Sequence, residues 1–291
     1  MRQESILNDI RIIALDLDGT LLTSDKRLSD RNRAALERAA AAGIAIVPTT
    51  GRIFPGLPAQ IRQLPFLRYA ITANGASVYD AAEDVTLYRE EIPVEKAVEI
   101  MAWLEGYPVI YDCYMEDRGW MTEAMWLQAE TYAPNKYYVE MIRTLRKPVP
   151  ELKAFLLERG SSVQKIQAFC LDEAMQAHLL REAPRRFDAL AVSTSVSRNV
   201  EINQDAANKG SALLALAKIL GVDRSQVMAF GDGINDLDMI RAAGVGVAME
   251  NAVDAVKQAA DRITLGNDAD GVAVVIEALP GIDNRHVSLS L

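Results

Sequence analysis

The chain has 291 residues, of which 50% are hydrophobic and 24% are charged, and its formal net charge is −9. This composition is typical of a water-soluble globular protein with a sizeable core, and the length suggests about two domains. Because the chain is acidic and has no run of five basic residues, we expect it to bind neither nucleic acid nor an anionic membrane surface.

The two cysteines, Cys113 and Cys170, are far apart in the sequence, which is not the spacing of a metal motif or of a disulfide framework. So few cysteines fit a reducing compartment. Residues 1–9 lack the apolar core of a signal peptide, and no run of 18 apolar residues is present to form a membrane-spanning helix. We therefore expect a cytoplasmic protein.

The N-terminal part begins with an apolar, β-branched run over residues 10–17, the pattern of a strand that is buried on both faces. Ser29 is a suitable N-cap for a helix over residues 30–42, which Gly43 would end. Residues 44–48 and 69–73 are predicted to form the second and third buried strands.

The middle of the chain, residues 86–195, has a different character, because all three tryptophans and most of the tyrosines lie there. The pattern predicts helices over 94–105, 151–159 and 172–183 and short strands over 109–114, 163–170 and 190–193. We interpret this segment as an inserted α+β cap domain. Its place after the third strand suggests a lid that excludes water and selects the substrate.

The C-terminal part returns to an alternation of strands and helices. Helices are predicted over 209–220, 233–243, 251–260 and 271–279, and strands over 226–230, 245–249 and 262–265. Such alternation indicates βαβ units. The predicted fold class is therefore α/β, with a Rossmann-like parallel-sheet core domain formed by residues 1–85 and 196–291.

Asp16 and Asp18 lie two residues apart where the first predicted strand ends, and ligands of open α/β sheets bind at that edge. Two carboxylates so close repel each other unless a cation lies between them, and Mg²⁺ prefers oxygen ligands. Gly19 allows a sharp turn with free backbone amides. The alternative is an ordinary Asx-turn at a strand end.

Two further segments offer groups for a phosphate. Thr49-Thr50-Gly51-Arg52 follows the second strand and combines hydroxyls, backbone amides and a guanidinium, although an ordinary loop is the alternative. Lys209 begins a helix, where a cation opposes the helix dipole, so an anion is expected beside it. The alternative for Lys209 is a solvated surface lysine.

The segment Gly231-Asp232-Gly233-Ile234-Asn235-Asp236 is acidic, rich in glycine and directly follows a predicted strand. Asp232 is expected at the same sheet edge as Asp16, where it would complete a cation site. Taken together, the four segments supply a nucleophile, an acid/base, a phosphate cradle and a metal site.

These four segments resemble the motifs of the haloacid-dehalogenase superfamily of phosphohydrolases. Ala73-Asn74-Gly75-Ala76 and the length of the insertion are similar to its Cof-type sugar-phosphatase branch. The resemblance implies that Asp16 attacks phosphorus to form an aspartyl-phosphate, and that Asp18 protonates the leaving alcohol and then deprotonates water. The implied activity is that of a phosphoric monoester hydrolase.

The resemblance also implies the ligands of the cofactor and substrate. Mg²⁺ would be held by the Asp16 carboxylate, the Asp18 backbone carbonyl and Asp232, with Asp236 orienting water or Lys209. The expected phosphate ligands share a place at the ends of the predicted strands and helices: Thr50, Gly51, Arg52, Asn74, Lys209 and Asn235. We assign the phosphate hydroxyl to Thr50 rather than to Thr49.

The expected substrate is a small phosphorylated metabolite, above all a sugar phosphate, and the protein is expected to be a monomer or a homodimer. Three alternatives stay open: a phosphomutase of the same fold, a phospho-receiver domain, and a non-catalytic metabolite-binding protein. His178 and His286 have no partner histidine at ligand spacing, and we assign neither a role.

Overall fold

The structure is a computed structural model that describes residues 9–282. The expectation about a signal peptide falls largely on residues 1–8, and these residues and His286 lie outside the described range. Within it, no helix is long and apolar enough to cross a membrane.

The chain divides into two compact units. The first, here called the core unit, comprises residues 9–51, 57–88 and 208–282 of the described chain, and the second, the inserted unit, comprises residues 52–56 and 89–207. The sequence pattern places residues 196–207 in the core. They belong instead to the inserted unit, because the strand they contain pairs with other strands of that unit.

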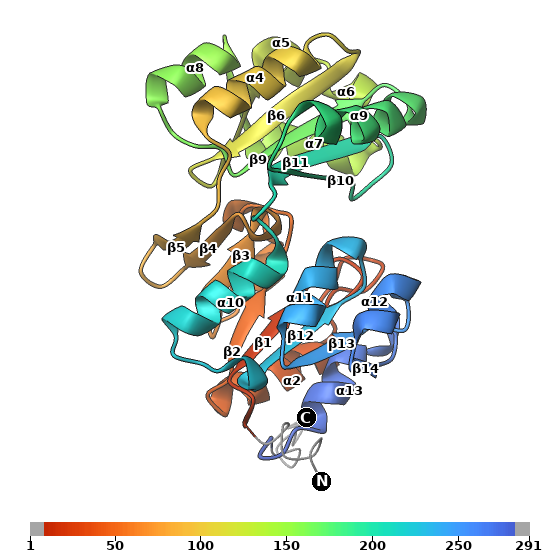
Figure 1. Ribbon diagram of the computed structural model, residues 1–291. Helices are drawn as coiled ribbons and strands as arrows, with labels where there is room; N and C mark the ends of the chain where they lie inside the picture. Colours follow the sequence, from red (N-terminus) through yellow and green to blue (C-terminus); the bar gives the residue numbers. More distant parts are fainter. Residues whose placement is uncertain (1–8, 283–291) are drawn as a thin grey trace. The chain divides into compact units, whose positions relative to one another are not determined.

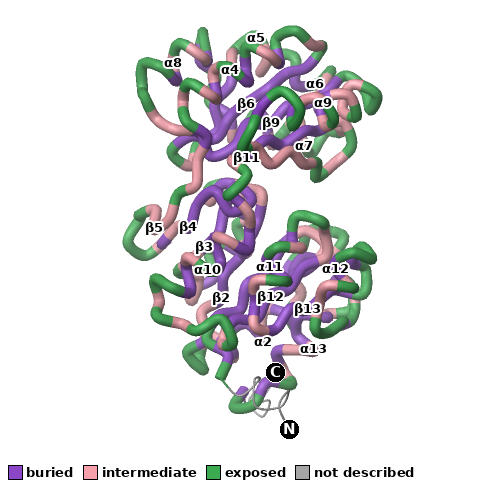
Figure 2. Tube along the Cα trace, in the orientation of Figure 1, coloured by how far each residue is buried: buried purple, intermediate pink, exposed green. Residues whose placement is uncertain are grey.

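The core unit contains a five-stranded sheet in which all strands are parallel (Figure 1). Its strands are, in spatial order, β14 (Arg262–Ile263), β13 (Val245–Ala248), β12 (Val227–Gly231), β1 (Ile12–Leu15) and β2 (Ala45–Pro48). All residues of β1, β12 and β13 are buried, as their apolar runs predict (Figure 2). The predicted parallel α/β core is confirmed.

The described α-helices of the core unit are α2 (Asp30–Ala41), α3 (Ala59–Arg62), α10 (Lys209–Ile219), α11 (Leu237–Ala242), α12 (Asp254–Ala259) and α13 (Gly271–Glu277). Five of them each follow a strand of this sheet, and the sixth, α10, follows the last strand of the inserted unit. Ser29 caps α2 as expected, because its side chain accepts a hydrogen bond from the Asn32 N–H. The helix expected over residues 233–243 is instead the short 3₁₀ turn η5 (Ile234–Asp236) followed by α11.

The third predicted strand, β3 (Tyr69–Thr72), does not join the five-stranded parallel sheet as a full member. One parallel β-bridge, between Thr49 and Ile71, connects β3 to that sheet. β3 is otherwise an edge strand of a separate three-stranded sheet with β4 (Ser77–Asp80) and β5 (Val85–Arg89). β3 and β4 pair antiparallel across the tight turn η3 (Ala73–Gly75).

The inserted unit is built on a six-stranded sheet. Its strands are, in spatial order, β10 (Leu190–Ser193), β11 (Asn199–Gln204), β9 (Lys165–Cys170), β6 (Val109–Met115), β7 (Arg118–Thr122) and β8 (Arg146–Val149). Its helices are α4 (Val94–Leu104), α5 (Glu123–Leu127), α6 (Ala129–Tyr132), α7 (Lys136–Leu145), α8 (Leu152–Arg159) and α9 (Glu173–Arg186). Along β6, Tyr111 and Cys113 pack with α4 and α8, whereas Ile110 packs with α6 and α7, so helices cover both faces.

Candidate active site

Asp16 and Asp232 come from neighbouring parallel strands of the core unit. Asp16 directly follows β1, and its N–H donates to the Phe230 carbonyl of β12 at 3.1 Å. Asp232 directly follows β12. Because parallel strands end at the same sheet edge, the two carboxylates meet there as expected.

The turn after Asp16 brings the backbone against Asp232. Gly19 has a φ of +93°, and a Cβ atom at this position would lie 2.4 Å from Oδ2 of Asp232. The next residue, Thr20, is fully buried, and its hydroxyl donates to Oδ1 of Asp232 at 2.7 Å. The Gly-Thr pair therefore both makes room for the second carboxylate and fixes its orientation.

Lys209 provides the ammonium that balances these carboxylates. Its side chain is fully buried, and Nζ lies 2.5 Å from Oδ1 of Asp16 and 2.5 Å from Oδ1 of Asp236. The helix start is held by Asn208, whose side chain accepts from the Ser211 N–H at 2.8 Å. The Lys209 side chain is therefore no solvated surface lysine, and the predicted anionic neighbour is present as two carboxylates.

The turn η3 sets the position of that helix start. Gly75 in this turn has a φ of +97°, and a Cβ atom there would lie 2.2 Å from the carbonyl oxygen of Asn208. A larger residue at Gly75 would push α10 away and move Lys209 with it.

Asp236 uses both of its carboxylate oxygens within the protein. Oδ1 contacts the Lys209 ammonium, and Oδ2 accepts from the N–H groups of Asp232 and Gly233, both at 2.9 Å. Asp236 is 1% exposed. These contacts suit a residue that orients Lys209 and the Asp232 backbone.

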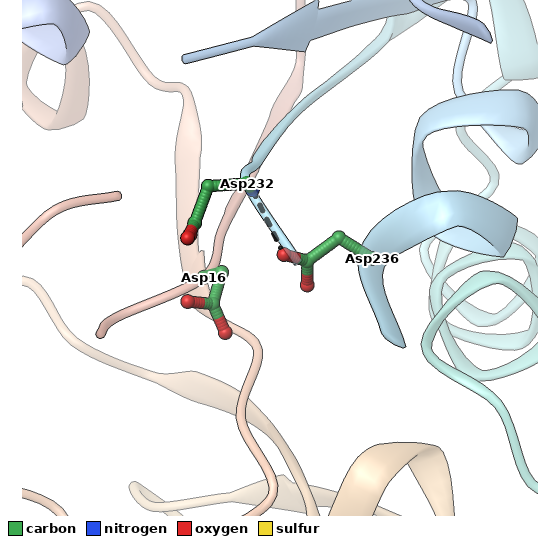
Figure 3. A group of neighbouring side chains, drawn as sticks. All are labelled: Asp16, Asp232 and Asp236. Atoms are coloured by element: carbon green, nitrogen blue, oxygen red, sulfur yellow. Dashed lines mark hydrogen bonds between the residues drawn. The ribbon is translucent and has the colours of Figure 1, made fainter. Parts of the chain in front are cut away.

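Three carboxylates thus lie close together, and the Lys209 ammonium contacts two of them, Asp16 and Asp236. The side chains of Asp16, Asp232 and Asp236 converge (Figure 3), and each offers a carboxylate oxygen within 4.8 Å of the others. Burial and the neighbouring carboxylates raise the pKa of Asp16 to about 8, although Lys209 opposes this shift. Burial likewise raises the pKa of Asp232 to about 6, against the hydrogen bond from Thr20. The carboxylates favour a further cation.

The donor set fits a hard divalent cation such as Mg²⁺. Asp16 and Asp232 offer carboxylate oxygens at one sheet edge, and one or two carboxylates are what Mg²⁺ commonly takes from a protein. The Asp236 oxygens already accept hydrogen bonds, which leaves it the less suitable ligand of the three. The Asp18 side chain is not one of the clustered carboxylates; the expectation for Asp18 concerned its backbone carbonyl.

Asp18 instead makes an ion pair outside this cluster. Oδ1 of Asp18 lies 2.9 Å from the ammonium of Lys26, and both side chains are partly exposed. Exposure to solvent is compatible with the proton-transfer role that the resemblance implies.

The predicted hydroxyl and amide ligands lie together in the core unit. The Thr49 hydroxyl donates to the Val47 carbonyl of β2 at 3.2 Å, which is compatible with Thr50 as the predicted phosphate ligand. The Asn74 N–H donates to the Thr50 carbonyl at 3.0 Å. A Cβ atom at Gly51 would lie 2.7 Å from Oδ1 of Asn74, so the two loops are in close contact.

The other two predicted phosphate ligands are Arg52 and Asn235. Arg52 belongs to the inserted unit, where its guanidinium donates to the Tyr137 hydroxyl at 2.9 Å and more weakly to the Gly56 carbonyl at 3.4 Å. Asn235 is exposed. Its Oδ1 lies close to the backbone of Gly233, where a Cβ atom would be 2.7 Å from that oxygen. The phosphate roles of both residues stay predictions.

Sequence reasoning missed the residues that brace the site. Thr20 belongs to the first motif, but the motif by itself indicates no role for it. Asn251 donates from Nδ2 to the Gly19 carbonyl at 2.8 Å, and Asn267 donates from Nδ2 to the Leu22 carbonyl at 2.9 Å. These side chains lie more than 200 positions away from the turn in sequence, so no local pattern could have linked them.

Comparison with known proteins decides the family. The model of the haloacid dehalogenase-like hydrolases matches residues 13–276, nearly the whole chain. The chain belongs to this family. The resemblance drawn from the four motifs is therefore confirmed.

Curated relatives align along almost their full length. The phosphatase YwpJ of Bacillus subtilis is 31% identical over 93% of this chain and 100% of its own. The pyridoxal phosphate phosphatase YbhA of Escherichia coli is 31% identical over 91% of this chain and 97% of its own. Together with the family match, these relatives make the chain a phosphoric monoester hydrolase.

The fold is shared with solved structures. A haloacid dehalogenase-like hydrolase from B. subtilis superimposes with a TM-score of 0.78 at 28% identity and covers 93% of this chain and 100% of its own. A haloacid dehalogenase-like hydrolase from Bacteroides thetaiotaomicron gives a TM-score of 0.77, also at 28% identity, over 92% of this chain and 98% of its own.

Proposed function

We propose that this protein is a Mg²⁺-dependent phosphatase that hydrolyses small phosphorylated metabolites through an aspartyl-phosphate on Asp16. The observation that carries the proposal is the cluster of Asp16, Asp232 and Asp236, in which the buried Lys209 ammonium contacts Asp16 and Asp236. This arrangement combines a nucleophile with a cation site at one sheet edge.

In the proposed first half-reaction, a carboxylate oxygen of Asp16 attacks phosphorus and the ester P–O bond breaks. Asp18 gives its proton to the departing alkoxide, and Asp16 carries the phosphoryl group. In the second half-reaction Asp18 takes a proton from water, the water oxygen attacks phosphorus, and the bond to Asp16 breaks to release phosphate. Thr50, the Gly51 amide, Asn74, Lys209 and Asn235 are the proposed phosphate ligands of the core unit, and Arg52 is the remaining proposed ligand.

The cation is held by Asp16, Asp232 and the Asp18 carbonyl in this proposal. When bound, it partly neutralises the phosphate and keeps the Asp16 carboxylate ionised. The second effect matters here because burial and the neighbouring carboxylates raise the pKa of Asp16 to about 8, and a further cation would favour its ionised, nucleophilic form.

The proposed substrate class rests on the activities of relatives. YbhA is a pyridoxal phosphate phosphatase, and YcsE of B. subtilis, 31% identical over 92% of this chain, is a 5-amino-6-(5-phospho-D-ribitylamino)uracil phosphatase. We propose sugar phosphates and coenzyme phosphates as the substrates of this chain. The buried free thiols of Cys113 and Cys170 fit the cytoplasmic location that we propose.

The test is phosphate release from a panel of sugar and coenzyme phosphates, measured with Mg²⁺ and with EDTA. We expect release that needs Mg²⁺ but no bisphosphate activator, which separates a hydrolase from a phosphomutase. Asp16→Asn should abolish turnover, whereas the control Asp238→Asn, an exposed carboxylate two positions beyond Asp236, should not change it. Full turnover by Asp16→Asn would contradict the mechanism.

A further inference from the structure

Lys26 lies in the turn that follows the acid pair, and its ammonium contacts Asp18. Nζ of Lys26 is 2.9 Å from Oδ1 of Asp18, and this oxygen is itself shielded from solvent although both side chains are partly exposed. A shielded oxygen is held more firmly by a cation than one that water can also reach.

The backbone of this turn has an unusual conformation at Lys26. Its φ is +61°, in the left-handed region that lysine rarely adopts. Two hydrogen bonds close the turn: the Lys26 N–H donates to the Thr23 carbonyl at 2.8 Å, and the Thr23 N–H donates to the Arg27 carbonyl at 2.9 Å. Such a conformation persists only where the surroundings enforce it, and it occurs often at functional sites.

The turn is also anchored to a distant part of the core unit. The N–H and hydroxyl of Ser24 donate to the two carboxylate oxygens of Asp268, at 2.8 Å and 2.6 Å. Asn267, the neighbour of Asp268, donates a hydrogen bond from Nδ2 to the Leu22 carbonyl at 2.9 Å. The Lys26 ammonium is therefore presented to Asp18 from a braced turn and not from a loose surface loop.

We propose that Lys26 is a positioning residue for the proton transfers of Asp18. By binding Oδ1, the Lys26 ammonium fixes the orientation of the carboxyl group that gives its proton to the leaving alkoxide and later takes a proton from water. The proposal rests on the proposed function, because it assumes that Asp18 is the acid/base. An ion pair at a partly exposed site adds little stability, so removing Lys26 should leave the protein folded and any effect on catalysis measurable.

The experiment compares two esters that differ in their need for a proton. An alkoxide leaving group, as in glucose 6-phosphate, departs with difficulty unless protonated, whereas nitrophenolate departs readily without a proton. Since kcat/KM covers the steps up to departure of the leaving group, it reports this difference. The variants are Lys26→Met, Lys26→Arg and the control Arg27→Met, whose side chain faces Asp25 instead.

We expect Lys26→Met to lower kcat/KM about tenfold for glucose 6-phosphate and less than about twofold for nitrophenyl phosphate, because only the first needs a well-oriented acid. Lys26→Arg should restore most of the loss, and Arg27→Met should match the unaltered protein. Equal losses on both esters, or no loss on either, would overturn the proposal.

Asp16→Asn and Asp18→Asn, measured alongside, separate this proposal from the proposed function. If Asp16→Asn still turns over, the covalent mechanism itself fails. A second outcome is that Asp16→Asn is inactive and Asp18→Asn loses activity mainly on glucose 6-phosphate. If Lys26→Met then shows no such selective loss, the proposed function stands and only the role of Lys26 fails.

Discussion

The Lys209 ammonium lies 2.5 Å from the Asp16 carboxylate, and this buried contact links the start of α10 to the end of β1. The same ammonium contacts Asp236. One buried cation therefore contacts two buried carboxylates, and we expect its removal to affect both the stability of the core unit and the proposed nucleophile, Asp16.

The first prediction concerns this cation. Lys209→Met should lower the free energy of unfolding by about 3 kcal/mol, because breaking a buried ion pair leaves charges without compensation. It should also reduce kcat at least 100-fold. Urea unfolding and phosphate release measure the two effects.

Lys218→Met, on the exposed side of the same helix, is the matched control and should change neither the free energy of unfolding nor kcat. Adding Asp236→Asn to Lys209→Met should recover stability but not turnover; no recovery would contradict the pairing.

The second prediction concerns pH. A carboxyl group whose pKa is raised by folding stabilises the protein below its unfolded pKa, and this contribution is lost as the pH rises through the folded pKa. For Asp16, this stabilisation is lost between about pH 4, near the unfolded pKa, and about pH 8, near the folded pKa. In EDTA, the stability of the protein relative to Asp16→Asn should therefore fall between pH 5 and pH 8.

Thermal unfolding of both proteins across this range is the measurement. Mg²⁺ should raise the melting temperature more at pH 8 than at pH 5, because metal ligands must be ionised. A stability difference between the two proteins that does not vary with pH would show that Asp16 titrates normally.

The third prediction concerns the hydroxyl that holds Asp232. Thr20→Val removes the 2.7 Å hydrogen bond but keeps the shape of the side chain. We expect the Mg²⁺ concentration for half-maximal activity to rise about tenfold or more, as for other groups that orient a metal ligand. Thr20→Ser keeps a hydroxyl and should stay close to the unaltered protein. An unchanged Mg²⁺ requirement in Thr20→Val would remove Asp232 from the proposed ligands.

The fourth prediction compares two glycines with positive φ. Gly43 has a φ of +86°, and a Cβ atom there would meet no other atom within 4 Å, whereas a Cβ atom at Gly75 would lie 2.2 Å from the Asn208 carbonyl. Gly43→Ala should cost about 1 kcal/mol from the backbone alone. Gly75→Ala should cost about 1–3 kcal/mol more and should also lower kcat, because Lys209 moves with α10. Equal costs in urea unfolding would show that η3 does not position the helix.

The fifth prediction tests the inserted unit. Nε of Arg146 lies 3.0 Å from Oδ2 of Asp112, and both side chains are fully buried. Arg146→Met alone should cost about 3–5 kcal/mol, whereas Arg146→Met combined with Asp112→Leu should cost much less, because no buried charge is left alone. Arg185→Met, which breaks an exposed pair with Glu182, should cost under about 1 kcal/mol. Urea unfolding followed by the tryptophans of the inserted unit, Trp103, Trp120 and Trp126, is the measurement.

Local patterns in the sequence predicted the core elements well. The apolar runs predicted β1, β2, β12 and β13 within one or two residues, because strands buried on both faces must be apolar throughout. The Ser29 cap was also predicted, because helix capping depends on residues that are neighbours along the chain. The strands and helices α5–α7, β7, β8 and β11 of the inserted unit were not predicted, because their polar and aromatic residues follow no clear period.

The sequence by itself determined the chemistry: the four motifs carry the carboxylates, the lysine and the turn glycines, and each motif follows from residue type and spacing. Only the tertiary structure decided which groups touch. The contacts of Lys209 with Asp16, of Thr20 with Asp232 and of Lys26 with Asp18 depend on strand order and on braced turns. Strand order arises from packing between residues far apart in the chain, which no local pattern encodes.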